Sequence, residues 1–379
     1  MTRKPKVLFV ADTTSHDDCS AVQRFRVLKA GLEKLGAQAD ILFLADYPVS
    51  SPRVLLAANM PLFLEKVRQY DFVHAAGLSL IALGLAKPFA DYKIVCDIHG
   101  STEEYRMNKT SQFDFSHSYQ VIASEIAWRM AKKKADWFVT VSEPLRQKML
   151  KDGVQKKRTE LIYNGVDTNL FKPCSREQNE TFTVTYAGAY QKWQGVENLV
   201  DAAELLRTEN IKFRFFGFQK HDFSLKEAIK AELKDKAELF DYKPRVANEQ
   251  PRAFVQELCQ SDVLIIPRYW NPAIPLYCNP EFVRTTFGWL PTKFAEYTAT
   301  GRPVIVTNLD AAAEFVEKTD CGFVCNADPK SLAGAILEAK NAGSKELDEK
   351  GMKGRRLAEE EFDLQVIGKR YFDGLTKIP

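Results

Sequence analysis

Short apolar runs alternate with amphipathic stretches along the whole chain. Lys6–Ala11 (KVLFVA) is a continuous apolar run typical of a buried strand, and Val22–Leu35 carries apolar residues at helical spacing before Gly36. The same strand-then-helix unit recurs several times, which is typical of a parallel sheet covered by helices. The sequence therefore predicts an α/β fold built on doubly wound, Rossmann-like parallel sheets.

Further strands are expected in the first half of the chain at Ala39–Leu44, Asp71–Ala75, Tyr92–Asp97, Asp136–Val141 and Thr159–Tyr163. Ser101–His117 is polar and aromatic with weak periodicity, which favours a loop. Tyr119–Lys134 has a helical pattern and ends in three lysines, which suit the negative end of a helix dipole.

The polar run Cys174–Glu180 interrupts this alternation, which then starts again. Strands are expected in the second half at Thr181–Ala187, Lys212–Phe216, Ala237–Phe240, Val263–Ile266, Pro303–Val306 and Gly322–Cys325. The last stretch, Leu347–Ile378, is helical by pattern with a break near Phe362. We therefore predict an N-terminal domain over residues 1–173, a second domain over 174–355, and a closing helix over 356–379 that returns to the first domain. Ligands bind at the carboxyl ends of strands in such sheets, so the two domains are expected to face a shared cleft.

Composition supports two globular domains, since 379 residues with 45% hydrophobic and 27% charged content exceed what one core usually organises. The longest apolar runs, such as Leu78–Leu85, are too short for a membrane span. The net charge is only +3, but residues 1–170 hold 24 Lys and Arg against 19 Asp and Glu. This basic first half favours either contact with an anionic membrane surface or acceptor, or simply a solvated surface.

The seven cysteines are scattered and form no paired CxxC motif, so we interpret them as reduced thiols of a cytoplasmic protein. No GxGxxG follows the first strand and no GxxxxGK[ST] occurs, which argues against a dinucleotide dehydrogenase and a P-loop enzyme. Paired metal-ligand patterns are also absent from the sequence. No bound metal or cofactor is expected, and no nucleic-acid partner.

The segment LIYNGVDTNLFKP, Leu161–Pro173, combines a strand, an Asn164–Gly165 turn and an aromatic-Lys-Pro exit at the domain junction. It resembles the interdomain segment of the group 1 (family 4) retaining nucleotide-sugar glycosyltransferases. That resemblance implies the GT-B architecture, in which the first domain binds the acceptor and the second binds a nucleotide diphosphate sugar as co-substrate.

A second resemblance covers Thr185–Leu206, which is similar to the opening of the family's donor domain. Gly188 permits a tight turn after the strand, and the helix after Gly195 offers free N–H groups to a diphosphate. The family's usual Arg and Lys fall on Ala189 and Gln194, so Lys192 or Lys293 is expected to supply the positive charge. An ordinary βα turn is the alternative.

The closest resemblance is GWLPTKFAEYTATGRPVIVTN, Gly288–Asn308, which is similar to the family's donor-site signature. It implies that the amides of Leu290, Pro291, Thr292 and Lys293 surround the diphosphate and that Glu296 accepts hydrogen bonds from the ribose. Pro291 contributes no N–H of its own. A glutamate common in the family falls on Gly288, and Glu281 is a candidate to replace it.

In the first domain, the CDIHG run ends the fourth expected strand with His99, where the family often has a histidine beside the donor sugar. His99 and Lys293 are therefore the expected catalytic residues, with His99 orienting the sugar. His16 and Arg24 are candidates for the acceptor side, although each is also compatible with an ordinary surface residue.

The sequence thus predicts a retaining glycosyltransferase of the hexosyltransferase class, acting on a glycan or lipid-linked acceptor in the assembly of a bacterial surface polysaccharide or glycolipid. Two alternatives stay open. One is a catalytically degenerate protein with a binding or regulatory role, and the other is a sugar-nucleotide epimerase or hydrolysing relative. The pattern names neither the nucleotide (UDP or GDP) nor the sugar.

Overall fold

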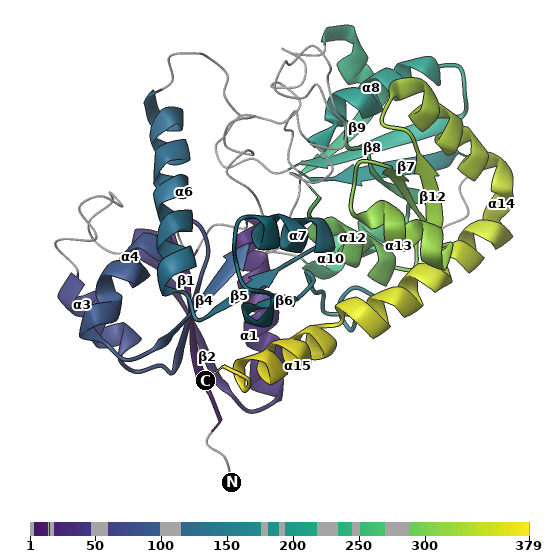
Figure 1. Ribbon diagram of the computed structural model, residues 1–379. Helices are drawn as coiled ribbons and strands as arrows, with labels where there is room; N and C mark the ends of the chain where they lie inside the picture. Colours follow the sequence, from purple (N-terminus) through teal and green to yellow (C-terminus); the bar gives the residue numbers. More distant parts are fainter. Residues whose placement is uncertain are drawn as a thin grey trace. The chain divides into compact units, whose positions relative to one another are not determined.

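The computed structural model describes residues 4–13, 15, 19–46, 60–98, 115–175, 181–188, 194–217, 234–244, 251–269 and 288–378. The chain divides into two units (Figure 1). The first unit holds Met1–Gly165, Thr285–Trp289 and Leu364–Pro379, and the second holds Val166–Arg284 and Leu290–Asp363. The chain therefore enters the second unit after Gly165 and returns to the first after Asp363.

A six-stranded parallel sheet forms the centre of the first unit, with the order β2-β1-β3-β4-β5-β6. The strands are β1 (Lys6–Ala11), β2 (Gln38–Phe43), β3 (Phe72–Ala75), β4 (Lys93–Ile98), β5 (Trp137–Thr140) and β6 (Thr159–Leu161). All six predicted strands are confirmed, with ends displaced by at most a couple of residues. The order reverses between β1 and β3, as in a doubly wound sheet.

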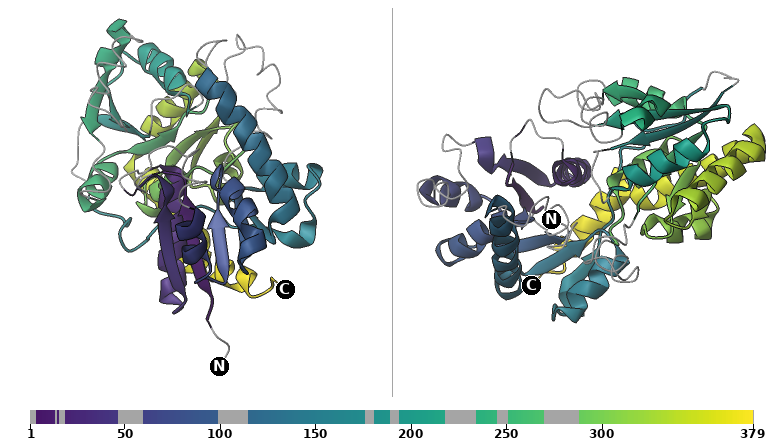
Figure 2. Two further views of the ribbon diagram at one scale, coloured as in Figure 1. Left: turned by 90° about the vertical axis from the view of Figure 1, so that its left-hand side faces the viewer. Right: turned by 90° about the horizontal axis from the view of Figure 1, so that it is seen from above.

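Helices cover the two faces of this sheet (Figure 2), and an apolar layer lies on each face. The helices are α1 (Ser20–Lys34), α3 (Met60–Val67), α4 (Ser79–Ala86), α6 (Phe115–Lys134), α7 (Glu143–Lys151) and α15 (Leu364–Leu375), with short 3-10 turns η1 (Leu44–Asp46), η2 (Lys87–Phe89) and η3 (Lys156–Arg158). Helices α1 and α15 pack on one face, and α3, α4, α6 and α7 pack on the other.

Helix α15, the last helix of the chain, lies directly against α1, the first helix. The two helices meet at Gly31 and Gly368, where a Cβ on Gly368 would lie 2.5 Å from the Gly31 Cα. Ile367, Tyr371 and Leu375 of α15 are buried in the same apolar layer as α1. The end of the chain therefore completes the core of the first unit.

The second unit repeats the design with the order β12-β11-β10-β7-β8-β9, again all parallel. Its strands are β7 (Phe182–Ala187), β8 (Ile211–Gly217), β9 (Phe240–Pro244), β10 (Val263–Ile266), β11 (Val304–Thr307) and β12 (Gly322–Cys325). The order reverses between β7 and β10. The strand expected at Ala237–Phe240 is wrong, because Lys234–Leu239 forms the 3-10 helix η5 and β9 begins only at Phe240.

The helices described in the second unit are α8 (Val196–Leu205), α10 (Pro251–Cys259), α12 (Thr292–Ala299), α13 (Ala312–Thr319) and α14 (Pro329–Leu357). A π-helical turn, η7 (Ala358–Phe362), follows α14. The helical pattern breaks at Asp363, as predicted. There the chain forms a parallel bridge with Val166, whose N–H donates to the Phe362 carbonyl at 2.8 Å.

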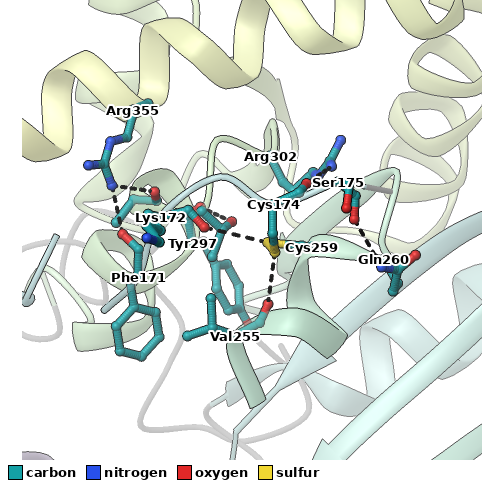
Figure 3. Close-up of a disulfide and its surroundings, with 12 residues drawn as sticks. Phe171, Lys172, Cys174, Ser175, Val255, Cys259, Gln260, Tyr297, Arg302 and Arg355 are labelled. Atoms are coloured by element: carbon teal, nitrogen blue, oxygen red, sulfur yellow. Dashed lines mark hydrogen bonds between the residues drawn. A yellow bond between two sulfur atoms is a disulfide. The ribbon is translucent and has the colours of Figure 1, made fainter. Parts of the chain in front are cut away.

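A disulfide joins Cys174 to Cys259, with their Cα atoms 5.9 Å apart (Figure 3). Cys174 lies just after the chain enters the second unit, and Cys259 ends α10. The reduced state expected for all seven cysteines is therefore wrong for this pair. The two residues are 85 positions apart, so their pairing depends on the fold and left no local sequence signal.

Candidate functional site

The carboxyl edge of the second sheet is the first place to look for a ligand, because open α/β sheets bind ligands where the strand order reverses. In this sheet that point lies between β7 and β10. Gly188 follows β7, and its N–H donates to the Phe216 carbonyl at 2.8 Å. The first turns of α8 and α12 supply side chains at the same edge.

The Lys293 ammonium lies next to Gly188. Its Nζ is 3.1 Å from the Tyr186 Oη and 2.9 Å from Oε1 of Gln194, and it lies 4.3 Å from the centroid of the Tyr186 ring. A Cβ at position 188 would come within 2.6 Å of this ammonium. The absence of a side chain on Gly188 therefore leaves space in which the Lys293 charge can lie at the end of β7.

Tyr297 fixes α12 against the end of β7. The Ala187 N–H donates to the Tyr297 Oη at 2.7 Å, and the same hydroxyl donates to the Ala187 carbonyl at 3.1 Å. Because Lys293 lies one turn earlier on α12, this contact directs its side chain toward Gly188. Glu296 precedes Tyr297 and is 8% exposed, so the residue as a whole is buried.

The loop that closes this edge begins with Leu290 and Pro291, both of which are buried, and Thr292 starts α12. The first N–H groups of a helix have no acceptor within the helix, and they carry its positive dipole end. An anion at this edge would thus meet the positive dipole end of α12 and the ammonium of Lys293 together.

Helix α8 approaches the end of β10 through Gly195. This residue has φ +75°, and a Cβ there would lie 2.0 Å from the Pro267 carbonyl oxygen. The Asn198 Nδ2 donates to the same oxygen at 3.2 Å. Gly195 therefore admits a close approach of the backbone at residue 267.

Sequence analysis missed the buried ion pair between Arg268 and Asp310, whose Nε and Oδ2 are 2.6 Å apart. Burial raises the pKa of the Asp310 carboxyl, and the charges of Arg268 and Lys293 oppose that rise. The pair lies just beyond β10 and β11, where Thr307 Oγ1 also donates to the Arg268 carbonyl at 2.7 Å. Arg268 directly follows the apolar run that ends at Pro267. A charged residue directly after a predicted buried strand is the sequence feature that could have indicated this ion pair.

In the first unit, Arg24 does not lie on the helix surface. Its side chain is 1% exposed, and its Nε donates to Asp97 Oδ2 at 2.7 Å. The charge expected to pair with an anionic acceptor is thus already paired inside the protein, and the surface position assumed for Arg24 is wrong. The reason is that α1 presents this residue to the buried face of the sheet, among the apolar side chains of Val22, Phe25 and Leu28.

Asn164 and Gly165 do not form the turn expected from the Asn-Gly pair. The chain is irregular there, without positive φ at Gly165, and the turn comes later, where the Phe171 N–H donates to the Asp167 carbonyl at 2.8 Å. Asn164 is 5% exposed, and its Oδ1 lies 3.4 Å from the Arg24 Nη1. The pair thus lies in the segment that joins the two units.

Four candidates named from the sequence, His16, His99, Lys192 and Glu281, lie outside the described residues. Their assignments stay predictions. The described part of the chain contains no group of three His, Cys, Asp or Glu side chains placed to hold a metal ion. Across the same residues, no helix is both long and apolar enough to span a bilayer.

Family models match both halves of the chain. The model for Glycosyltransferase Family 4 matches residues 14–170, and the model for Glycosyl transferases group 1 matches residues 181–341. The chain belongs to these glycosyltransferases. The family expected from the three sequence segments is therefore confirmed, and the two matches fall on the two sheets described above.

Solved structures confirm the GT-B fold over the whole of this glycosyltransferase. Sucrose-phosphate synthase from Thermosynechococcus elongatus has 17% identity and a TM-score of 0.74, with 99% of each chain covered. A glycosyltransferase from Rickettsia africae has 17% identity and a TM-score of 0.72, covering 99% of this chain and 98% of that one. HepE from Anabaena, in complex with UDP and glucose, has 16% identity and a TM-score of 0.70, with coverage of 98% and 100%. A search of curated proteins found no match.

Proposed function

We propose that this glycosyltransferase takes its sugar from a nucleoside diphosphate donor held at the carboxyl edge of the second sheet. The observation that carries the proposal is the Lys293 ammonium, 2.9 Å from Gln194 and beside Gly188, at the first turn of α12. Its charge and the positive dipole end of α12 suit the diphosphate. Glu296, one turn along the same helix, suits the ribose hydroxyls as an acceptor.

The first unit would supply His99 and the acceptor site, as the family resemblance implies. In this mechanism the amides and Lys293 stabilise the departing nucleoside diphosphate, and His99 orients the sugar. Transfer would retain the configuration at the anomeric carbon. The NMR spectrum of the first product formed tests this directly. A product whose anomeric carbon has the configuration opposite to that of the donor would overturn the retaining mechanism.

The acceptor is proposed to be a glycan or a lipid-linked sugar of a bacterial surface polysaccharide or glycolipid. Support comes from the fold likeness to WaaG, described as a glycosyltransferase of lipopolysaccharide biosynthesis, with 14% identity and a TM-score of 0.69. HepE complexes contain UDP and UDP-glucose, which makes UDP the first nucleotide to test.

The deciding experiment is a thermal-shift and calorimetric screen of UDP, GDP, ADP, TDP and CMP, with the intact protein and a Glu296→Ala variant. A ligand that binds only the folded state raises its melting temperature. One nucleoside diphosphate should bind, and the variant should bind it at least tenfold more weakly. If none binds, the donor proposal fails and a degenerate binding protein is favoured. Donor turnover that needs no acceptor would instead favour an epimerase or hydrolase.

We also propose that the first unit contacts an anionic membrane surface, at the cytoplasmic face where such lipids attract basic residues. Five large apolar side chains are exposed on α3, α4, η2 and α6: Leu62, Leu85, Phe89, Ile122 and Ile126. On α6, Ile122, Ile126, Arg129 and Lys133 are all exposed and share one helix face by their spacing. An apolar and basic face of this kind suits the boundary between headgroups and acyl chains.

Vesicle sedimentation tests this surface, with vesicles of phosphatidylcholine alone or with 30% phosphatidylglycerol. The wild type should bind the anionic vesicles in a salt-dependent manner, and Ile122→Asn with Ile126→Asn should reduce binding at least fivefold. Leu205→Asn, which removes an equally exposed leucine of the second unit, is the matched control. Equal binding by both variants would overturn the proposed surface.

A further inference from the structure

A chain of buried polar contacts joins four elements of the first unit. Arg24 of α1 donates to Asp97 of β4 at 2.7 Å, and the same Asp97 Oδ2 lies 3.0 Å from His74 Nε2 on β3. The other ring nitrogen of His74 lies 2.7 Å from the Tyr371 Oη on α15. All four side chains are within a few per cent of complete burial.

A neutral His74 satisfies both of its contacts in this network. Burial raises the pKa of Tyr371 well above its ordinary value, and the Asp97 charge adds to that rise. Tyr371 therefore keeps its proton and can donate it to His74 Nδ1, which leaves the His74 Nε2–H to donate to Asp97. A neutral His74 leaves Arg24 and Asp97 as the two charges of the network, and these two are paired directly.

Arg24 also reaches the segment that follows β6. Its Nη1 donates to the Tyr163 carbonyl at 2.9 Å and lies 3.4 Å from the Asn164 Oδ1. Asp97 is the residue before the last one of β4. Asn164 is the residue before Gly165, after which the chain enters the second unit. One guanidinium therefore fixes the chain at two strand ends that are separated in the sheet by β5.

Stability alone is a poor reason for this arrangement. The surroundings are apolar and aromatic, with the His74 ring 4.9 Å from the Phe9 ring and 5.1 Å from the Phe25 ring. Replacing a buried ion pair by apolar residues of similar volume is often neutral or stabilising. Unlike an apolar pair, the ion pair includes a guanidinium that forms directional hydrogen bonds to the Tyr163 carbonyl and to Asn164.

We propose that Arg24 and Asp97 are positioning residues for the transfer reaction. They set the chain at Ile98, which leads into His99, and at Tyr163–Gly165, which leads into the second unit. The inference rests on the proposed function for the role of His99. Donor binding is assigned to the second unit and is independent of Arg24.

The test compares Arg24→Lys, Arg24→Met and Asp97→Asn with Lys29→Met, which removes an exposed ion pair from the same helix. Lysine keeps the charge beside Asp97 but lacks the fork that reaches Tyr163 and Asn164. We expect Arg24→Lys to recover much of the melting temperature lost in Arg24→Met. Its kcat for UDP-sugar turnover should still fall at least tenfold, with the Kd for UDP changed less than twofold. Amide exchange at residues 161–166 should rise at least fivefold.

The opposite results overturn the proposal. A kcat within twofold of wild type in Arg24→Lys, or unchanged exchange at residues 161–166, would make the pair purely structural. If Arg24→Met does not fold, Arg24→Lys and Asp97→Asn decide. A wild-type protein that turns over no donor would contradict the proposed function. Amide exchange at residues 161–166 in the Arg24 variants would then test the inference about Arg24 without reference to activity.

Discussion

The ammonium nitrogen of Lys293 lies 2.9 Å from the side-chain oxygen of Gln194, the position on which the family resemblance places a lysine. The positive charge is therefore present in the same neighbourhood but comes from a different helix. We predict that Lys293→Gln weakens UDP binding about 10- to 100-fold, since a hydrogen bond to a charged group contributes about 1.5–3 kcal/mol. Adding Gln194→Lys to this variant should raise its affinity for UDP at least tenfold.

Isothermal titration calorimetry with UDP and UMP measures both effects. The loss should be larger for UDP, because the β-phosphate is the group proposed to meet the ammonium. Lys345→Gln, an exposed lysine of α14, is the control for a general change of charge. Equal UDP affinity in Lys293→Gln and wild type would rule out the relocated charge, and a failed swap would show that position 194 cannot replace it.

Gly188 provides a second probe of the same place. A Cβ there would lie 2.6 Å from the Lys293 Nζ and 2.7 Å from the Tyr186 Oη. The lysine end is flexible, so Gly188→Ala should displace the ammonium, and the contact with the buried Tyr186 ring should cost some stability. We expect UDP affinity to fall at least tenfold while the melting temperature changes by only a few degrees.

Gly195→Ala is the contrasting variant, because its Cβ would meet the backbone of Pro267 at 2.0 Å in a left-handed conformation. It should lower the melting temperature far more than Gly188→Ala does. A Gly188→Ala protein with wild-type affinity for UDP would separate this glycine from the donor site.

The sequence predicted the strands well where apolar runs are continuous and bounded. Lys6–Ala11 and Val263–Ile266 are strands with the predicted ends, because each contains a continuous buried apolar run bordered by a proline on one side and an aspartate on the other. At Ala237–Phe240 the prediction failed. Charged residues surround Ala237, and a 3-10 helix satisfies the backbone there before Phe240 joins β8.

Contacts between distant residues explain the other misses. The placement of Lys293 beside Gly188 was suggested by a motif, whereas the contact of Arg24 with Asp97 spans 73 positions and has no local signature. A surface arginine and a buried one look alike in a helical pattern, because the pattern does not show which distant carboxylate meets the guanidinium. The Cys174–Cys259 bond was missed for the same reason.

The disulfide gives a stability prediction. Closing a loop of 85 residues removes entropy from the unfolded chain, which corresponds to about 4.6 kcal/mol in the chain-entropy account. Reducing agent should therefore lower the melting temperature of the wild type by several degrees, and should have no such effect on a Cys174→Ser, Cys259→Ser protein. Cys19→Ser, which removes an exposed free thiol, should behave as wild type. Equal thiol titres before and after reduction would refute the bond.

The contact between α1 and α15 gives a prediction for the end of the chain. A Cβ on Gly368 would lie 2.5 Å from the Gly31 Cα, so Gly368→Ala must push the two helices apart, and overpacking of this kind costs about 1–3 kcal/mol. Gly334 in α14 is the matched control, because a Cβ there meets nothing within 4 Å and Gly334→Ala should stabilise by about 0.5–1 kcal/mol. Urea denaturation measures both changes. Gly368 meets the backbone of α1, whereas Gly334 is exposed and meets nothing. Two variants that shift the free energy of unfolding in the same direction would therefore contradict the close helix crossing.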